Sequence, residues 1–432
     1  MHKSLPKPLI AVPSFPGSNG EVDNIRTLKR CGFDCFVFRW NDSLEKLKDV
    51  DGYFFGAGFS YEDRGRSGMV AARDPLFRFM AEEAERGKVI VGNCNGAQVL
   101  IESGLIPLGD GLKMCLARNA IRGSDNSWRS PGFLNEWVWI KPVCAEDRCA
   151  TSGWKGTMHI PIAHGEGRFV TRDPDLIAAL KDDDQIAFAY CTENGEISAD
   201  PSVTPNGSTM GIAGICNKAG NVVALMPHPE RTPLGDPYFL SIKRWIASKK
   251  DAGLLTRGER QKGKRAKGQN EIGGSPIVVS NREPMPVEIF IDTIITNNEE
   301  RTVEQAARRI EPTVRLKQYK YVGLKSDCAR ELLSSLSFFN PHKELAFVRQ
   351  NGKIHSWDSD ECVLKPAPHS ILKGISLLRR DEPDTGAAGL GDGAETGVCY
   401  DCREVTQDQL LKTKVCEVFC NPHSSSLERM CL

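Results

Sequence analysis

Short apolar runs alternate with segments of helical periodicity through about the first 250 residues, and this alternation restricts the fold more than any other feature of the chain. "LIAVPSF" (9–15) is a continuous apolar run, as a parallel strand buried on both faces should be, and "KVIVGN" (88–93) is a further strand. Between such strands, Val22, Ile25 and Leu28 recur at helical spacing. We therefore predict an α/β fold built on a doubly wound, mostly parallel sheet.

Changes in composition predict three parts. Residues 1–250 form the α/β domain. Residues 251–285 are basic, polar and Gly-rich without apolar periodicity, which indicates a flexible linker. Nucleic-acid binding is the alternative for this segment, but no aromatic residue interleaves its charges. Residues 286–432 form a smaller α+β domain, with a loop at about 381–397.

The overall charge and the cysteine usage restrict the class of protein. The chain has 56 basic and 56 acidic residues, so its net charge favours neither nucleic acid nor an anionic membrane. It has no apolar run of about 18 residues and no signal-peptide core at its start. Its 15 cysteines are odd in number and mostly embedded in apolar runs, which is typical of reduced thiols. We therefore expect a cytoplasmic protein that binds neither nucleic acid nor membrane.

The stretch "VGNCNGAQVLIESG" (91–104) runs from a strand directly into a helix, with Cys94 at the turn. Such a turn residue lies at the carboxyl edge of the sheet, where ligands bind in open α/β folds. The free N–H groups and positive dipole end of the helix favour a thiolate there. Gly92 and Gly96 suit a tight turn, and the N–H of Asn95 would face an oxyanion. The pattern predicts a nucleophile, and a buried structural cysteine at a strand end is the alternative.

A thiolate nucleophile needs a base, and the base needs a group that orients it. His228 lies in "ALMPHPER", just after an apolar strand, with Glu230 two residues on. Alternate residues of an extended segment point the same way, so these two side chains can form a hydrogen bond. His164 in "IAHGEGRF" also has a carboxylate, Glu166, two residues on. The residues alone therefore leave both histidines as candidates for the base.

Several motifs in one order resemble a known family. "GNCNGAQ", "PIAHGEGRFV" and "MPHPER" are similar to the class I glutamine amidotransferases. Within that class they resemble the PurQ-type glutaminase subunits of phosphoribosylformylglycinamidine synthase, an enzyme of purine biosynthesis. "FPGSNGEVDN" (15–24) and "GAGFSYEDRGRSG" (56–68) also match the pattern of that subunit. The resemblance covers residues 8 to about 247.

The resemblance implies a role for each matching residue. Cys94 corresponds to the nucleophile, His228 to the general base and acid, and Glu230 to the group that orients the imidazole. The residues that it places at the substrate are Gly58, as a backbone donor of the oxyanion hole, Asn95 and Gln98. The residues that it places along the pocket or toward a partner, in a supporting role, are His164, Glu166 and Arg168.

The chain departs from the family pattern at three points. The usual "PGGFSY" is replaced by a sequence with Ala57 at its second position, where a Cβ would restrict the loop of the oxyanion hole. Gly20 stands where the family often has cysteine, and residues 121–132 look like a longer loop than usual. These departures concern the rate and not the type of reaction that the resemblance implies.

The implied reaction is acyl transfer from glutamine, which yields glutamate and ammonia. The chain has no G-x-x-x-x-G-K-[ST] phosphate loop, so we expect no cofactor in it. The resemblance implies a separate synthetase subunit that binds ATP and Mg²⁺ and uses the ammonia to convert formylglycinamide ribonucleotide to formylglycinamidine ribonucleotide. The alternatives are another class I amidotransferase subunit, a catalytically weak docking or regulatory relative, and a γ-glutamyl hydrolase that acts alone.

The C-terminal part has a second resemblance. "VEIFIDTIITNNEERTVEQAARRIEPTVRLKQYKYVGL" (287–324) is similar to the small PurS-type subunit that joins glutaminase and synthetase in many bacteria. "TQDQLLKTKVCEVFCNPH" (406–423) resembles the second helix of that subunit, which places a long insertion between the two halves. An unrelated α+β appendage is the alternative.

A cluster of cysteines near the C-terminus raises the question of a zinc site. The candidate ligands are Cys399, Cys402, Cys416, Cys420 and His423. The first pair has C-x-x-C spacing, but the second pair encloses the apolar residues Val418 and Phe419. This pattern favours core cysteines, so we expect no metal.

Overall fold

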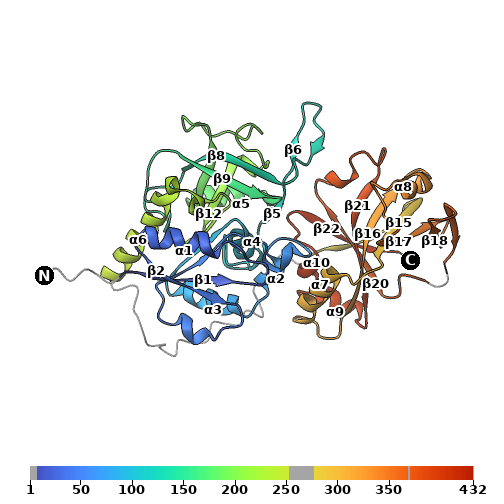
Figure 1. The fold of residues 1–432 in the computed structure, drawn as a ribbon, viewed down its shortest axis with the longest axis horizontal. Coiled ribbons are helices and arrows are strands. Elements are labelled where there is room, and N and C mark those ends of the chain that lie inside the picture. The colour runs from blue at the N-terminus through green and yellow to red at the C-terminus, as the bar shows by residue number, and fades with distance from the viewer. Residues whose placement is uncertain (1–6, 253–276, 368–369, 432) are drawn as a thin grey trace. The chain divides into compact units, whose positions relative to one another are not determined.

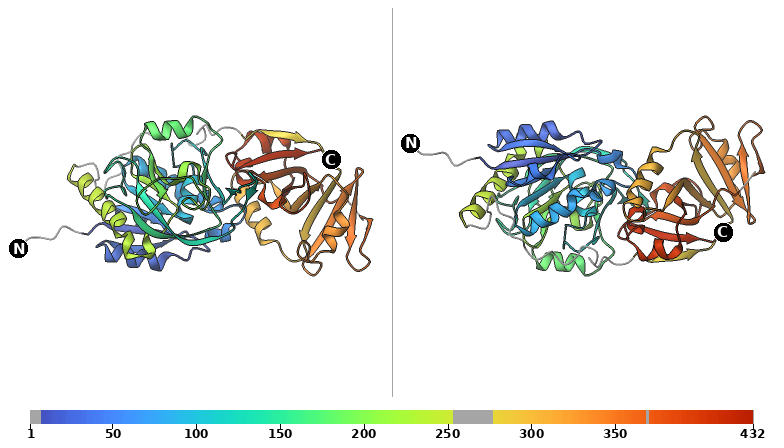
Figure 2. Two further views of the ribbon diagram at one scale, coloured as in Figure 1. Left: turned by 90° about the horizontal axis from the view of Figure 1, so that it is seen from above. Right: turned by 90° about the horizontal axis from the view of Figure 1, so that it is seen from below.

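The computed structural model divides the chain into two compact units, Met1–Ser275 and Pro276–Leu432. In Figures 1 and 2 the first unit runs from blue to yellow-green and the second from yellow to red. The structure describes residues 7–252, 277–367 and 370–431. Most of the expected linker, residues 251–285, lies outside these ranges, but Val279–Arg282 forms strand β14 of the second unit. No helix within the described ranges combines the length and the apolar character needed to cross a membrane.

In the first unit, the strands that the structure describes form one sheet of nine and two short ladders. Five neighbouring strands of the large sheet run parallel. Four antiparallel strands extend it at one side. The expected doubly wound sheet is therefore confirmed, with its parallel part limited to five strands. In spatial order the strands are β2 (Asp34–Arg39), β1 (Leu9–Ser14), β3 (Gly52–Phe55), β4 (Val89–Asn93), β13 (Val222–Leu225), β12 (Ile212–Cys216), β11 (Ile186–Cys191), β8 (Leu134–Pro142) and β9 (Met158–His164).

Helices cover both faces of this sheet, because successive residues of a strand point to opposite faces. In β1, Ile10 and Val12 belong to one apolar cluster, and Ala11 belongs to the other. Helices α1 and α6 cover the first cluster, and α2, α3, α4 and α5 cover the second. Burial on both faces explains why the sequence of β1 is continuously apolar. The helices are α1 (Glu21–Arg30), α2 (Met69–Ala72), α3 (Leu76–Glu85), α4 (Asn95–Glu102), α5 (Leu176–Asp182) and α6 (Asp236–Asp251).

The segment 121–132, expected as a long loop, contains one of the two short ladders. The guanidinium carbons of Arg122 and Arg168 lie 4.9 and 5.7 Å from the centre of the Trp128 ring. The cation–π contact with Arg168, which lies outside this segment, attaches the half-exposed indole to the body of the unit. The ladders pair β5 (Cys115–Arg118) with β10 (Glu166–Val170), and β6 (Ile121–Arg122) with β7 (Trp128–Arg129).

In the second unit, the described strands form another sheet of nine, which is almost wholly antiparallel. The strand–helix–strand expected at 287–324 is present, and Asn297 caps its helix by accepting a hydrogen bond from the N–H of Glu300 (3.0 Å). The segment 406–423 contains two short helices. The α+β character of this unit is therefore confirmed. In spatial order the strands are β14 (Val279–Arg282), β22 (Ser425–Met430), β20 (Ile375–Asp381), β21 (Glu395–Arg403), β16 (Arg315–Leu324), β15 (Val287–Thr293), β17 (Glu344–Gln350), β18 (Lys353–Asp358) and β19 (Val363–Pro366). The helices are α7 (Asn298–Arg308), α8 (Ala329–Ser334), α9 (Gln407–Lys412) and α10 (Cys416–Phe419).

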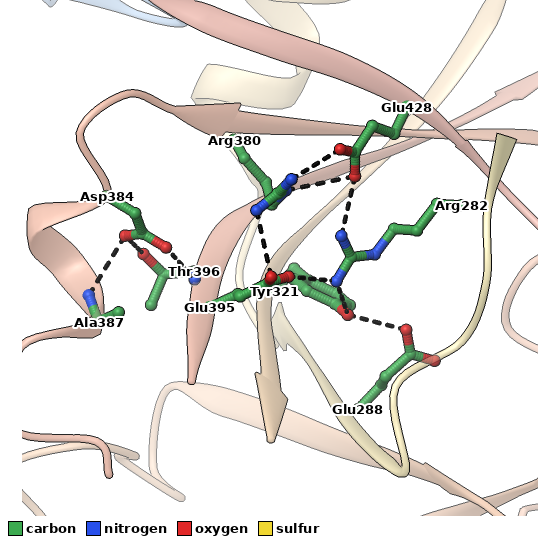
Figure 3. Close-up of polar contacts among 9 residues, drawn as sticks. All are labelled: Arg282, Glu288, Tyr321, Arg380, Asp384, Ala387, Glu395, Thr396 and Glu428. Carbon is green, nitrogen blue, oxygen red and sulfur yellow. Dashed lines mark hydrogen bonds and ion pairs between the residues drawn. The ribbon is translucent and has the colours of Figure 1, made fainter. Parts of the chain in front are cut away.

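The loop expected at about 381–397 connects β20 to β21, and one carboxylate organises it. Asp384 accepts hydrogen bonds from the N–H and the hydroxyl of Thr396 (2.6 and 2.5 Å) and from the N–H of Ala387 (3.2 Å). Figure 3 shows these contacts. The connection is therefore a turn held to the start of β21 and not an open linker.

Ion pairs hold β14 to the rest of the second unit (Figure 3). Arg282 donates to Glu428 of β22 (2.8 Å) and forms an ion pair with Glu395 of β21. Arg380 of β20 contacts the same two carboxylates, at 2.7 and 3.3 Å. Two arginines and two glutamates balance each other in charge, so the desolvation cost of this mostly buried cluster is offset within it. The end of the expected linker is thus a structural part of the second unit.

Candidate active site

Cys94 occupies a strained turn between β4 and α4. Its backbone has φ 51° and ψ −108°, a left-handed value that residues with a side chain seldom adopt. A Cβ on Gly96 would overlap the carbonyl of Phe55 in β3, and a Cβ on Gly92 would overlap the backbone of Gly96. The two glycines therefore let strand and helix approach closely enough to form the turn. The sequence pattern that predicted a sharp strand-to-helix turn has this physical basis.

His228 and Glu230 form a buried pair at the end of β13. The imidazole Nδ1 lies 2.7 Å from Glu230 Oε1, and both side chains are buried. The N–H of His228 donates to the carbonyl of Pro161 in β9 (2.9 Å), which fixes the backbone of the histidine. Cys94 lies close enough to raise the pKa of this ring, but its thiol donates to the carbonyl of Ala163 (3.6 Å), and His228 Nε2 has no hydrogen-bond partner among the described residues. The structure thus joins His228 to Glu230 directly and places Cys94 near the imidazole, with Nε2 unoccupied by any residue that it describes.

The electrostatics of this group favour a protonated imidazole. Burial alone would lower the pKa of His228, but the thiol of Cys94 and the carboxylate of Glu230 raise it to about 10. Burial opposes ionisation of Glu230, but His228 outweighs it and lowers the pKa of the carboxyl. At neutral pH the pair is therefore an imidazolium and a carboxylate, and the imidazolium can stabilise a thiolate.

His164 has the opposite environment. Burial, together with repulsion from His228, lowers its pKa to about 3. Within the described residues neither ring nitrogen has a hydrogen-bond partner. Glu166 does not pair with it, because β9 ends at His164 and the Glu166 carboxylate instead accepts from the N–H of Ser67 (3.0 Å). His164 is therefore a neutral imidazole without an orienting carboxylate, which distinguishes the two histidines that the sequence left open.

The residues expected at the substrate lie around the start of α4. Asn95 Oδ1 accepts from the N–H of Ser60 (3.1 Å), and Asn95 Nδ2 donates to Gln98 Oε1 (2.9 Å). Gln98 Nε2 donates to the carbonyl of Glu166 (2.5 Å). Gly58 lies two residues before Ser60, on the loop that these contacts tie to the helix, and has φ 148°. Hydrogen bonds therefore connect three segments, around residues 58, 95 and 166, at the start of α4.

Two of the departures from the family pattern, Gly20 and Ala57, lie in contact with each other. Ala57 is buried in the apolar cluster that includes Cys94, so its methyl group is accommodated by packing. A Cβ at Gly20 would lie only 2.6 Å from the carbonyl oxygen of Ala57, closer than real contacts allow. The absence of a side chain at position 20 thus fits the conformation of the loop at Ala57.

The sequence did not single out several polar side chains near this group. Asn93 Nδ2 donates to Glu230 Oε2 (3.1 Å), and Thr27 Oγ1 donates to the Glu230 carbonyl (2.7 Å). Asp63 accepts from Asn95 Nδ2 (3.2 Å), and burial with the nearby Glu166 raises its pKa to about 7. The sequence could have indicated Asn93, because it is a polar residue at the end of an apolar strand. No sequence signal indicates Thr27, which lies 203 residues from its partner.

The C-terminal thiols pack as core cysteines do. All four are buried, and Cys416 and Cys420 donate to the carbonyls of Leu410 (3.2 Å) and Ser425 (3.4 Å). Throughout the part of the chain that the structure describes, no group of three or more His, Cys, Asp or Glu residues could hold a metal ion. The 15 cysteines all lie in that part, and all are free thiols.

Comparisons with known proteins show the family to which the first unit is similar. A family model for the CobB/CobQ-like glutamine amidotransferase domain matches residues 7–243. The PurQ subunit of phosphoribosylformylglycinamidine synthase from Methanothrix thermoacetophila is 45% identical over 226 residues, which cover 51% of this chain and 86% of that protein. The PurQ subunit from Pyrococcus horikoshii is 36% identical over 244 residues, 55% of this chain and 97% of that protein. A solved structure, PurLQS from Thermotoga maritima, matches with a TM-score of 0.43 and 31% identity, and covers 56% of this chain and 99% of that chain.

Proposed function

Because the chain belongs to the family of CobB/CobQ-like glutamine amidotransferase domains, we propose that it hydrolyses glutamine to glutamate and ammonia and delivers the ammonia to a synthetase. The observation that carries the proposal is the buried group in which Cys94, at a strained turn, lies near an imidazole that Glu230 holds and whose Nε2 is unoccupied within the described part of the chain. A nucleophile, a base and an orienting carboxylate are the parts that acyl transfer through a cysteine requires.

In the proposed reaction, the Cys94 thiolate attacks the side-chain amide carbon of glutamine. The oxyanion of the tetrahedral intermediate accepts hydrogen bonds from the N–H groups of Gly58 and Asn95, and losing one such donor costs about 100- to 1000-fold in rate. His228 gives its proton to the departing nitrogen, so the C–N bond breaks, ammonia leaves and a glutamyl thioester remains. The neutral His228 then takes a proton from water, which hydrolyses the thioester to glutamate. Gln98 contacts the bound glutamine.

The names of the relatives support a specific partner. Two relatives that share 45% and 36% identity with this chain are subunits of phosphoribosylformylglycinamidine synthase. We infer that the ammonia acceptor is a synthetase subunit that binds ATP and Mg²⁺ and converts formylglycinamide ribonucleotide to formylglycinamidine ribonucleotide in purine biosynthesis. The free thiols support a cytoplasmic location.

Glutamine turnover, measured with and without the synthetase subunit, tests this function. We expect turnover by the full chain to rise when the synthetase, ATP and formylglycinamide ribonucleotide are added together, with one amidine formed for each glutamine consumed. Equal turnover without the synthetase would identify a hydrolase that acts alone. No turnover under either condition would identify a docking relative, and turnover that responds only to another synthetase would identify a different amidotransferase subunit.

The second unit has a proposed role as a tethered bridging module. The support is the PurS-like sequence at 287–324, which folds as β15, α7 and β16. Joining two modules in one chain raises their effective mutual concentration to about the millimolar range. The fusion would thus make the bridging module available to the glutaminase at every concentration of the protein.

A truncated chain tests the bridging role. A chain that ends at residue 252 is expected to fold and hydrolyse glutamine, but to couple poorly to the synthetase. Adding residues 277–432 as a separate polypeptide should restore coupling, and this fragment must begin before β14, which pairs with β22. The measurement is glutamine-dependent amidine formation, with ammonia-dependent formation as the control. Full coupling by the truncated chain alone would show that the second unit is an unrelated appendage.

A further inference from the structure

Glu230 is held by more than its contact with His228. Its two carboxylate oxygens have different partners: Oε1 lies 2.7 Å from His228 Nδ1, and Oε2 accepts from Asn93 Nδ2 (3.1 Å). Its backbone carbonyl accepts from Thr27 Oγ1 (2.7 Å). An ionised carboxylate can only accept hydrogen bonds. The amide nitrogen of Asn93, and not its oxygen, must therefore face Glu230.

This orientation of the Asn93 amide requires a donor on its other side. The hydroxyl of Tyr238, in α6, lies 3.0 Å from Asn93 Oδ1 and donates to it. Both side chains are fully buried. Burial, together with nearby Cys149 and Glu230, raises the pKa of Tyr238 well above its usual value, so the hydroxyl stays protonated. The hydrogen bonds therefore run in one direction, from Tyr238 through Asn93 to Glu230.

The fold fixes both ends of this chain of hydrogen bonds. Asn93 is the last residue of β4 and directly precedes Cys94, so one strand end supplies both the nucleophile and the support of its base. The Tyr238 ring packs between Phe188 and Phe239, with ring centres 5.9 and 5.5 Å away. Neither side chain has room to change rotamer without disturbing the core.

We propose that Asn93 and Tyr238 are positioning residues that hold the Glu230 carboxylate so that His228 keeps its proton on Nδ1 and presents Nε2 to Cys94. The proposal rests on the proposed glutaminase function. Without Asn93, the carboxylate loses its side-chain donor on Oε2 and can rotate away from Nδ1. The imidazole then loses both its orientation and the charge that keeps it protonated.

Labelling of Cys94 by the diazoketone analogue of glutamine tests the proposal in the full chain without a partner. This reagent alkylates the nucleophilic thiol and needs a proton from a nearby acid, and mass spectrometry locates the label. Asn93→Ala should lower the labelling rate by about 10- to 100-fold, the effect of losing a hydrogen bond to a charged group. Tyr238→Phe keeps the ring and the packing and should lower the rate by about 3- to 10-fold.

Two readouts distinguish positioning from a general loss of structure. In wild type, the labelling rate should stay high up to alkaline pH, because His228 stays protonated. In Asn93→Ala, the pH above which the labelling rate falls should be lower. Tyr238→Phe should have little further effect on the labelling rate in the Asn93→Ala background, because the proposed path from its hydroxyl to Glu230 runs through the amide. Tyr53→Phe is the matched control, since that buried hydroxyl donates to Glu83 (2.8 Å), outside this chain of hydrogen bonds. It should leave both the rate and the pH profile unchanged.

The possible results separate this inference from the proposed function. A wild-type rate and profile in Asn93→Ala, or fully additive effects in the double variant, would overturn the inference and leave the glutaminase proposal intact. If Asn93→Ala does not fold, a wild-type labelling rate and pH profile in Tyr238→Phe would overturn the inference instead. Wild-type protein that takes up no label at Cys94 would overturn the proposed function and the inference together.

Discussion

Replacing Cys94 with alanine is expected to abolish glutamine-dependent amidine synthesis and to leave ammonia-dependent synthesis by the complex unchanged. The thiolate forms the covalent bond to the substrate, and no other side chain at the turn can take its place. Removing a nucleophile of this kind lowers the rate by roughly five to six orders of magnitude. The measurement is amidine formation by the reconstituted complex, with glutamine in one series and an ammonium salt in the other.

A second cysteine serves as the control for Cys94→Ala. Cys35 lies in β2, is partly buried and has its thiol 3.9 Å from the carbonyl of Ile25, so Cys35→Ala removes a similar volume outside the site. It should leave both reactions unchanged. If Cys94 were only a structural cysteine, Cys94→Ala would lower stability and reduce both reactions together. Glutamine turnover that survives in purified Cys94→Ala would rule out its role as nucleophile.

The turn at Cys94 could be predicted because its determinants are local. An apolar run, a pair of glycines and a helix-forming segment lie within 14 residues, and each limits the backbone where it occurs. The parallel strands were predictable for the same reason, since burial on both faces requires continuously apolar sequence. The pairing of β11, β8 and β9 was not, because the choice between parallel and antiparallel pairing of distant segments depends on the connections between them.

The support of the base could not be predicted, because it depends on contacts between distant parts of the chain. Tyr238 lies 145 residues from Asn93, and Thr27 lies 203 residues from Glu230. A buried tyrosine on a helix has the sequence pattern of any core aromatic residue. The structure identifies it because its hydroxyl donates to Asn93 Oδ1, on the amide whose nitrogen faces Glu230.

The two histidines were indistinguishable in sequence for a related reason. Each precedes a glutamate by two residues, a spacing expected to pair the two side chains through an extended backbone, but at His228 the pair forms although the backbone is not extended. At His164 the strand ends and β10 begins at Glu166, so the carboxylate points to Ser67. At His228 the backbone turns, with φ −108° and ψ 81°, and Glu230 returns to the ring. The different course of the backbone, and not the spacing, decides which histidine has a carboxylate.

Replacing His228 with asparagine is expected to slow formation of the glutamyl thioester by at least about 100-fold and up to about 10,000-fold, the contribution of a positioned acid and base. Asparagine cannot hold the positive charge that stabilises the thiolate, and it cannot give a proton to the departing nitrogen. Rapid mixing of the full chain with glutamine, followed by acid quench and mass spectrometry of the thioester, measures this step directly.

His164→Asn is the matched comparison for His228→Asn, because both replace a fully buried imidazole with the same side chain. The pKa of His164 is lowered to about 3, so at neutral pH it carries no charge, and its loss removes neither a cation nor a proton donor. We therefore expect a much smaller defect in thioester formation from His164→Asn than from His228→Asn. A larger defect in His164→Asn would reverse the assignment of the base, because it would mean that the neutral ring takes the proton and that the pair of His228 and Glu230 only supports the fold.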